Sequence, residues 1–315
     1  MHTPPKLTLY AQNGCNDFVF NLPFSLFQAQ VDGKALFEFS VCSDSGRAIM
    51  TEFGVKIAVQ GNLSLMDSAD IIVIAGWVGD MPSRVFVEKL QSAHQNGKKI
   101  IGLCYGTFGL GYAGILSGRT VVTHWAGEWA FREQFADIAL DGNRLYVDDG
   151  NILTSAGASA GLDCCLYFIR TLYGVSVANH LARVYVSAPH REGGQAQFVQ
   201  MPVTSHTKDD KINELLDFLS KNLADTHRLD ELADRVHLSK RSFNRHFKNA
   251  TNMTLSEWLT AKRLAYAQEC LETSNDNMER IAQKAGFGTA SNLRMQFKDK
   301  FGVSPQAWRR SFGGG

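Results

Sequence analysis

The feature that most constrains the fold of this 315-residue chain is an internal repeat near its C-terminal end. The segment from Leu232 to Trp258 matches the segment from Ile281 to Trp308 once a single residue is inserted in the second copy. Small and apolar residues in this order are typical of a helix, a tight turn and a second helix that pack at a steep angle. We therefore predict an all-α region with two helix-turn-helix units. The matched pairs are Leu232 with Ile281, Val236 with Ala285, Leu238 with Phe287, Phe247 with Phe297, Trp258 with Trp308, Arg245 with Arg294 and Lys248 with Lys298.

The second helix of each unit carries polar and basic residues on its outward face. It is expected to begin near Ser239 in the first unit and near Thr289 in the second, with Ser239 and either Thr289 or Gly288 as caps. Arg bonds guanine and Asn bonds adenine in bidentate fashion, while Lys and Ser commonly hold phosphates. A joining helix from Leu255 to Thr273 would let one chain enter successive major grooves. The predicted DNA-binding residues are Ser239, Lys240, Arg241, Ser242, Asn244, Arg245, Thr289, Ser291, Asn292 and Arg294.

Residues 211–315 resemble the DNA-binding domain of the AraC/XylS family. The segments 281–287 (IAQKAGF) and 297–305 (FKDKFGVSP) closely follow the long signature of that family. Gly288 stands where the family often has Ser, and this departure predicts a second helix that lacks its usual side-chain cap. The resemblance implies a sequence-specific activator that binds promoter or operator DNA, with RNA polymerase as a further candidate partner. A plain helical bundle with a solvated basic face is the alternative interpretation.

Charge is unevenly distributed along the chain, although the net charge is only +1. Residues 208–315 carry 18 Lys and Arg against 14 Asp and Glu, whereas residues 1–207 carry 14 against 17. A basic C-terminal part fits an anionic partner such as a phosphate backbone.

The chain is long enough to form two domains, each with its own hydrophobic core. We expect domains at 1–187 and 210–315, joined by a polar linker at 188–209 that contains two prolines and two adjacent glycines.

The first 187 residues alternate buried strands with amphipathic helices. This alternation is typical of βαβ units and of a mostly parallel sheet that is covered by helices on both faces. We predict a doubly wound, flavodoxin-like α/β domain. Its strands are expected at Lys6–Tyr10, Leu36–Cys42, Ile71–Ala75 and Lys99–Cys104, and its helices at Leu22–Gln30, Pro82–Asn96, Thr107–Leu116, Ala158–Tyr173 and Val177–Val186.

Residues 102–106 (GLCYG) have the form of a nucleophile elbow centred on Cys104. Glycines on both sides allow a sharp strand-to-helix turn, and the amino end of the following helix would favour a thiolate. With residues 113–119 (AGILSGR) leading to His124, and with residues 155–161 (SAGASAG), the domain resembles the class I glutamine-amidotransferase-like or DJ-1/PfpI group. The combination of this domain with the C-terminal helix-turn-helix units resembles AraC-family regulators that use such a domain as their sensor.

Two catalytic supports of that group are missing from this sequence. In its enzymes a His usually follows the Cys, and an acid stands four residues ahead of a proline, whereas here those places hold Tyr105 and Val19. A thiol without a base or a proton partner would turn over poorly, so we assign no catalytic residue and expect no enzyme. We expect instead a pocket for a small-molecule effector at the carboxyl ends of the strands. Its predicted lining residues are Cys104, Tyr105, Gly76, Trp77, His124 and Trp125.

Other interpretations stay open. The chain could be a cysteine hydrolase or glyoxalase of the DJ-1/PfpI type with an accessory DNA-binding domain, or a redox regulator that acts through Cys104. Equally, Cys104 could be an inert thiol, His124 a structural histidine and Trp77 part of the core. His190 and Glu192 imitate the His-x-Glu pair of amidotransferases, but their setting beside two glycines argues against that role.

The six cysteines include no CxxC pair and no histidine spacing that suits zinc, so neither a metal nor a cofactor is predicted. Adjacent Cys164 and Cys165 are expected in a helix core. No apolar run of about 18 residues and no export signal is visible, which predicts a cytoplasmic protein without a membrane partner. The helical surfaces of the N-terminal domain are expected to form a homodimer, as in related regulators.

Overall fold

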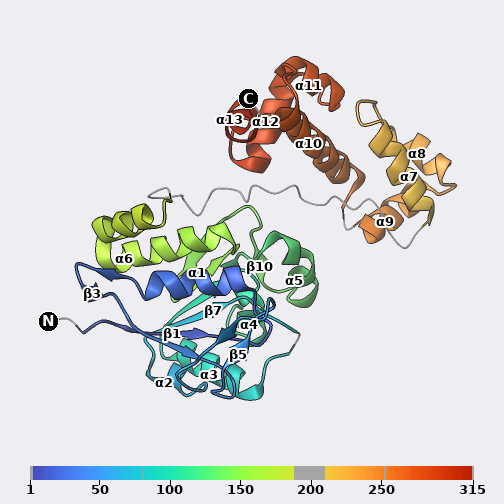
Figure 1. Cartoon of the computed structure of the whole chain (residues 1–315). Coiled ribbons are helices and arrows are strands. Elements are labelled where there is room, and N and C mark those ends of the chain that lie inside the picture. The colour runs from blue at the N-terminus through green and yellow to red at the C-terminus, as the bar shows by residue number, and fades with distance from the viewer. Residues whose placement is uncertain (1–2, 80, 188–209, 252, 314–315) are drawn as a thin grey trace. The chain divides into compact units, whose positions relative to one another are not determined.

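The computed structural model describes residues 3–79, 81–187, 210–251 and 253–313. The chain divides into two compact units, residues 1–197 and 198–315 (Figure 1). The predicted linker, with His190 and Glu192, lies outside the described residues. Within the described ranges, no helix is long and apolar enough to cross a membrane.

The N-terminal unit is built on a six-stranded sheet in the order β11-β12-β8-β7-β1-β4. All neighbouring strands are parallel except β11 and β12. The five parallel strands follow the order 2-1-3-4-5, which is the order of flavodoxin-like sheets. The predicted doubly wound, mostly parallel fold is therefore confirmed. The strands are β1 (Lys6–Tyr10), β4 (Glu38–Cys42), β7 (Ile71–Ala75), β8 (Lys99–Leu103), β11 (Tyr146–Asp149) and β12 (Ile152–Ser155).

Helices cover both faces of this sheet (Figure 1). Alternate residues of each strand point to opposite faces, so β7 places Val73 in one core cluster and Ile72 in the other. On the first face lie α1 (Asp17–Phe27) and α6 (Ser159–Val184), and on the second lie α2 (Leu65–Ser68), α3 (Arg84–Gln95), α4 (Gly106–Tyr112) and α5 (Glu128–Gln134). Short elements complete the unit: β2 (Gln30–Val31), β3 (Lys34–Ala35), β5 (Ile49–Met50), β6 (Lys56–Ile57), β9 (Thr120–Val121), β10 (Ala139–Leu140) and the 3-10 turn η1 (Trp125–Gly127).

The helices of this unit differ from their predicted bounds: α3 is shorter at both ends, α4 ends at Tyr112 rather than at Leu116, and α1 and α6 differ most. The helix predicted from Leu22 begins five residues earlier, because the Asn16 side chain caps it by accepting the backbone N–H of Val19 at 3.0 Å. Pro23 therefore lies inside the helix rather than in its first turn. The two helices predicted at 158–173 and 177–186 form one element, α6, which is interrupted by the non-helical backbone of Gly174.

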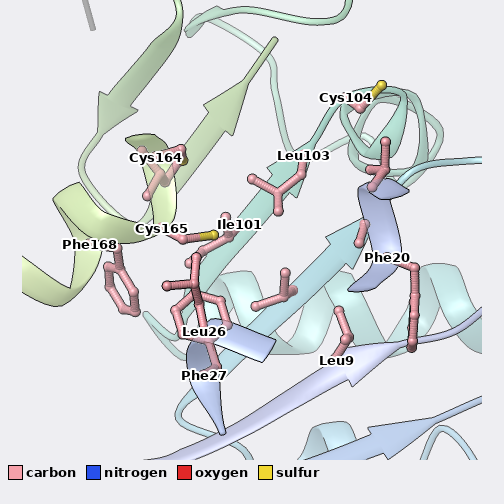
Figure 2. Packing of buried hydrophobic residues seen from close by; sticks show 14 of the residues in the cluster. Leu9, Phe20, Leu26, Phe27, Ile101, Leu103, Cys104, Cys164, Cys165 and Phe168 are labelled. Atoms are coloured by element: carbon pink, nitrogen blue, oxygen red, sulfur yellow. The ribbon is translucent and has the colours of Figure 1, made fainter. Parts of the chain in front are cut away.

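The first core cluster is rich in aromatic side chains. Figure 2 shows Phe27 of α1 near Ile101, with Phe168 and Cys165 of α6 on the same side, whereas Phe20 of α1 lies farther away, on the side of Leu9. Both Cys164 and Cys165 are fully buried, as predicted for a helix core. Burial raises the pKa of both thiols well above the usual range, which keeps them protonated and unreactive.

The C-terminal unit is all-α, as predicted. It has two separate apolar clusters, one around Phe243, Phe247 and Trp258 and one around Phe297 and Trp308. Helix α10 contributes to both of them, and its observed bounds equal the predicted ones. The helices are α7 (Asp210–Lys221), α8 (Leu229–Arg235), α9 (Lys240–Thr251), α10 (Leu255–Thr273), α11 (Met278–Lys284), α12 (Ala290–Phe301) and α13 (Pro305–Phe312).

Candidate effector site and DNA-binding face

Cys104 lies at the turn between β8 and α4, at the carboxyl edge of the sheet (Figure 2). Its backbone has φ 59°, a left-handed conformation that a non-glycine residue rarely adopts. The surrounding structure holds this turn: the Cys104 N–H donates to the carbonyl oxygen of Ser155 at 2.9 Å, and the Thr123 hydroxyl donates to the Cys104 carbonyl at 3.0 Å. Gly106 is required after it, because a Cβ there would lie 2.1 Å from the Ile74 carbonyl oxygen. The residues 102–106 thus form the predicted elbow.

The Cys104 side chain is a protonated thiol at neutral pH. It is 5% exposed, and burial raises its pKa to about 11. A backbone hydrogen bond from Tyr105 acts in the opposite direction but is the smaller effect. The expectation of a thiolate was therefore wrong, because desolvation outweighs the favourable field at the start of this seven-residue helix.

Three of the predicted pocket residues lie together beside the elbow. The ring centroid of His124 is 5.7 Å from that of Tyr105 and 5.5 Å from that of Trp125. His124 caps η1 through its Nδ1, which accepts the N–H of Ala126 at 3.3 Å. Burial lowers the pKa of His124, so the neutral imidazole is favoured. All three rings are partly exposed, and they offer a ligand aromatic faces and one imidazole edge.

The other two predicted residues follow β7. The Gly76 N–H donates to the carbonyl oxygen of Leu103 at 3.0 Å, which places Gly76 beside the elbow strand. Trp77 lies on the second face of the sheet, where its ring centroid is 5.1 Å from that of Phe86. It also covers Gly109 of α4, since a Cβ at 109 would lie 2.7 Å from the indole. Trp77 thus has a packing role under α4 in this structure.

Gln12 is a candidate site residue that sequence reasoning missed. It follows β1 at the point where the connections from β1 and β7 diverge, which is where ligands commonly bind in such sheets. Its side-chain amide pairs with the backbone of Val78, with Nε2 donating to the carbonyl at 2.7 Å and Oε1 accepting the N–H at 2.8 Å. The strand order would have pointed to Gln12, but the order is known only from the tertiary structure.

The two predicted recognition helices are α9 and α12, and each presents one polar face. Ser239 accepts the N–H of Ser242 at 3.2 Å, and Thr289 accepts the N–H of Asn292 at 3.2 Å. The expectation that Gly288 leaves the second helix uncapped was therefore wrong, since Thr289 is the cap. The exposed residues are Lys240, Arg241, Asn244, Arg245, Lys248 and Asn249 on α9, and Ser291, Arg294, Met295, Lys298 and Asp299 on α12.

The two caps correct one pairing of the repeat. Arg245 stands six residues after its cap, whereas Arg294 stands five after its own, so the structural counterpart of Arg245 is Met295. The inserted residue falls in the turn before Thr289, and it shifts every later pair by one. Met295 is 65% exposed. The outward faces of the two units therefore differ in chemistry at the place where the first carries an arginine.

Several predicted DNA-binding side chains already have partners within the chain. Arg294 lies 3.7 Å from the Glu279 carboxylate, and Lys240 lies 3.7 Å from Asp230. The amide of Asn292 is used twice: Nδ2 donates to the Phe287 carbonyl at 3.0 Å, and Oδ1 accepts from Gln296 at 2.9 Å. Asn292 thus stabilises the turn of the second unit. The exposed ion pairs are weak and can open toward a phosphate.

The described residues contain no group of three or more His, Cys, Asp and Glu side chains that could hold a metal ion.

Comparisons with known proteins agree with both units. The DJ-1/PfpI family matches residues 5–171, and the family described as a helix-turn-helix domain matches residues 232–311. The HTH-type transcriptional regulator GbdR of Pseudomonas aeruginosa is 26% identical over 283 residues, which are 89% of this chain and 77% of GbdR. The HTH-type transcriptional activator RhaS of Yersinia pestis is 35% identical over 102 residues, which are 32% of this chain and 37% of RhaS.

A solved structure supports the fold. The crystal structure of an AraC family transcriptional regulator from Pseudomonas putida has a TM-score of 0.52 at 17% identity, and the match covers 58% of this chain and 100% of that one. From the family matches and the relatives above, the chain belongs to the DJ-1/PfpI family and is a DNA-binding transcription regulator with a helix-turn-helix domain.

Proposed function

We propose that this regulator reads two half-sites in DNA with α9 and α12, and that a small molecule bound at the carboxyl edge of the N-terminal sheet controls the reading. The observation that carries the proposal is the pair of capped helices, each with an apolar inner face and a polar outer face. The ten residues predicted from the sequence are the proposed DNA contacts. Among them, Ser239, Thr289 and Asn292 contribute mainly by stabilising their own turns through hydrogen bonds to the backbone.

The two units should contribute unequally. The exposed face of α9 has four cations, whereas that of α12 has two cations and one acid. Each phosphate contact releases counterions, so the first unit should account for more of the salt dependence of binding. The test is selection of binding sites from a random DNA duplex library with the full chain, followed by titrations at several salt concentrations. The proposal fails if no sequence is enriched over the starting library.

The proposed effector site comprises Cys104, Tyr105, Gly76, His124 and Trp125. Trp77 supports this site by packing against α4. Partly exposed aromatic rings beside a neutral imidazole suit a small polar or cationic molecule. A metabolite screen by thermal shift would identify the ligand. Replacing Trp125 by Ala should abolish the shift, and the same change at Trp129, an exposed tryptophan on α5, is the control. Equal effects of the two changes would contradict the site.

The chain is proposed to act without catalysis or thiol redox chemistry. The observations behind this are the burial of Cys104, which raises the pKa of its thiol, and the presence of Val19 and Tyr105 at places where the family's enzymes carry catalytic partners. Cys104→Ser should keep DNA binding but alter its response to the effector, because Cys104 belongs to the proposed effector site. A substrate turnover that disappears in this variant would support a DJ-1/PfpI-type enzyme, and a peroxide-dependent DNA affinity that disappears would support a redox regulator.

The organisation of the protein is also part of the proposal. We place the domain boundaries at 1–187 and 210–315, with a linker at 188–209, and we propose a homodimer that acts as an activator in the cytoplasm, without a cofactor, metal or membrane partner. The exposed apolar residues Leu172, Val175 and Val184 of α6 support a dimer surface. Limited proteolysis tests the linker, sedimentation tests the dimer, and transcription with purified RNA polymerase tests activation. Reduced transcription from the selected promoter would indicate a repressor.

A further inference from the structure

Helix α10 is the structural element shared by the two helix-turn-helix units. Its first half packs Trp258 and Leu259 into the core of the first unit, and its second half packs Leu264 and Leu271 into the core of the second. The two apolar clusters are separate, so neither core by itself determines how the units are oriented. The orientation then depends on α10 and on polar contacts between the units.

Arg263 stands on α10 between the two clusters and makes such a contact. Its Nε donates to the carbonyl oxygen of Leu223 at 2.9 Å, and its Nη2 donates to that of Asp225 at 2.9 Å. Both carbonyls belong to the loop that follows α7, in the first unit. A guanidinium has a planar array of donors, so two hydrogen bonds hold the loop in one orientation relative to α10.

Gly286 brings the second unit to the same point. It lies in the turn between α11 and α12, and a Cβ there would be 2.2 Å from the Leu223 carbonyl oxygen and 2.7 Å from the Arg263 Nε. The turn of the second unit therefore contacts the loop of the first unit directly, with the guanidinium against both. Leu223, Arg263 and Gly286 form what we call the inter-unit latch.

We propose that Arg263 is a positioning residue that holds the two helix-turn-helix units at one mutual orientation, and that the latch thereby sets the half-site spacing this regulator accepts. The inference rests on the proposed reading of two half-sites. One base pair inserted between half-sites rotates one of them by about 35° about the DNA axis and moves it by about 3.4 Å. Two helix-turn-helix units held by the latch cannot reorient to reach the displaced half-site. Units joined by α10 alone can reorient toward it.

The glycines of the second turn provide matched variants. Gly286 has φ +80° and Gly288 has φ +72°, so alanine introduces similar backbone strain at both positions. Only at Gly286 does the added methyl meet the latch, because a Cβ at Gly288 has no atom within 4 Å. Comparison of Gly286→Ala with Gly288→Ala separates loss of the latch from general strain. Arg263→Ala removes the latch without backbone strain, and Arg263→Lys should give an intermediate result.

The first experiment measures the orientation without DNA. Spin labels are attached to Lys248→Cys on α9 and Lys298→Cys on α12 of the full chain, in a Cys270→Ser background, because the other five cysteines are buried. Electron-electron double resonance should give a narrow distance distribution in the parent and in Gly288→Ala. Arg263→Ala and Gly286→Ala should broaden it at least about twofold, with unchanged helical circular dichroism. An unchanged distribution in Arg263→Ala overturns the proposal.

The second experiment measures spacing on DNA. The site selected by the parent protein is synthesised with one base pair removed, or with one or two added, between its halves. The parent should lose about tenfold in affinity for each change, and Arg263→Ala and Gly286→Ala about threefold or less. A merely destabilised protein would lose affinity on every duplex alike and keep its preference, which would overturn the assignment. If the parent selects no DNA, the spacing role fails with the proposed function, while the distance measurement still reports on the latch itself.

Discussion

Gly157 lies directly against Cys104, since a Cβ at position 157 would be 2.2 Å from the Cys104 Cβ and 2.8 Å from its Sγ. Gly157 has φ +76°, and Ala158 after it has φ +47°. The loop after β12 and the elbow after β8 are thus shaped to fit each other at the edge of the sheet. Because this contact involves backbone and a short side chain, neither partner can move aside cheaply.

We predict that Gly157→Ala destabilises the N-terminal unit by more than its backbone strain alone. The strain of alanine at positive φ costs about 1–2 kcal/mol, and the clash should add about 1–3 kcal/mol. Gly114→Ala is the control, because Gly114 has φ +70° and nothing within 4 Å of its Cβ. Urea unfolding measures both variants. Equal losses would show that the contact with Cys104 relaxes without cost.

Alkylation of Cys104 by iodoacetamide should be slow at pH 7 and should rise steeply toward pH 11. The thiolate is the reactive form, and burial holds the pKa of Cys104 at about 11. Mass spectrometry of the peptide that contains Cys104 measures the rate at each pH. Cys270, which is only partly buried, is an internal comparison. Rapid modification at pH 7 would show that the thiolate is populated, and would revive the catalytic and redox interpretations.

His124 should make the protein less stable as the pH falls below about 6.5. Burial lowers its pKa in the folded state, so the unfolded chain binds the proton first and gains in population as the pH decreases. The stability that neutral His124 contributes is fully present above the pKa of His124 in the unfolded chain. It is lost as the pH falls from that value through the lower pKa of His124 in the folded protein. His124→Asn keeps an acceptor for the Ala126 N–H and should show a weaker pH dependence between pH 7.5 and 5.5. Parallel unfolding curves for the two proteins would contradict the effect of burial.

Thr289→Ala should destabilise the second helix-turn-helix unit by about 1 kcal/mol, because α12 loses the side chain that accepts the Asn292 N–H. Thr289→Ser should restore most of the stability, since the hydroxyl can make the same hydrogen bond. Thermal unfolding of the full chain, followed by circular dichroism, measures both. No loss in the alanine variant would mean that another group caps this helix.

Arg245→Ala should weaken specific DNA binding by about 1–3 kcal/mol if the guanidinium reads a base. Met295 occupies the matched position of the second unit and has no charge, so Met295→Ala should change the salt dependence of binding very little. Titrations on the selected site and on unrelated DNA distinguish the roles: an equal loss on both would indicate a phosphate contact. Full affinity in Arg245→Ala would remove α9 from the proposed contact surface.

Much of this architecture is visible in local sequence. Strands β1 and β7 have the predicted bounds. Their short apolar runs are typical of strands in a buried parallel sheet, and the polar or glycine residues that follow mark the strand ends. Helix α10 also has its predicted bounds, where Thr254 and Glu257 form a capping box. The early start of α1 was missed, because a proline is favoured in the first turn of a helix, whereas here Asn16 caps the helix and Val19 and Phe20 are buried before the proline.

The sequence by itself determined the two fold classes, the tandem units and the elbow around Cys104, since these depend on periodicity, turn residues and spacing within short segments. Tertiary structure decided the rest. Trp77 lies under α4, Gln12 lies at the divergence of the strands, and Arg245 is matched with Met295 only when both caps are seen. The protonated state of Cys104 is likewise a tertiary property, because desolvation is imposed by segments that are distant in sequence.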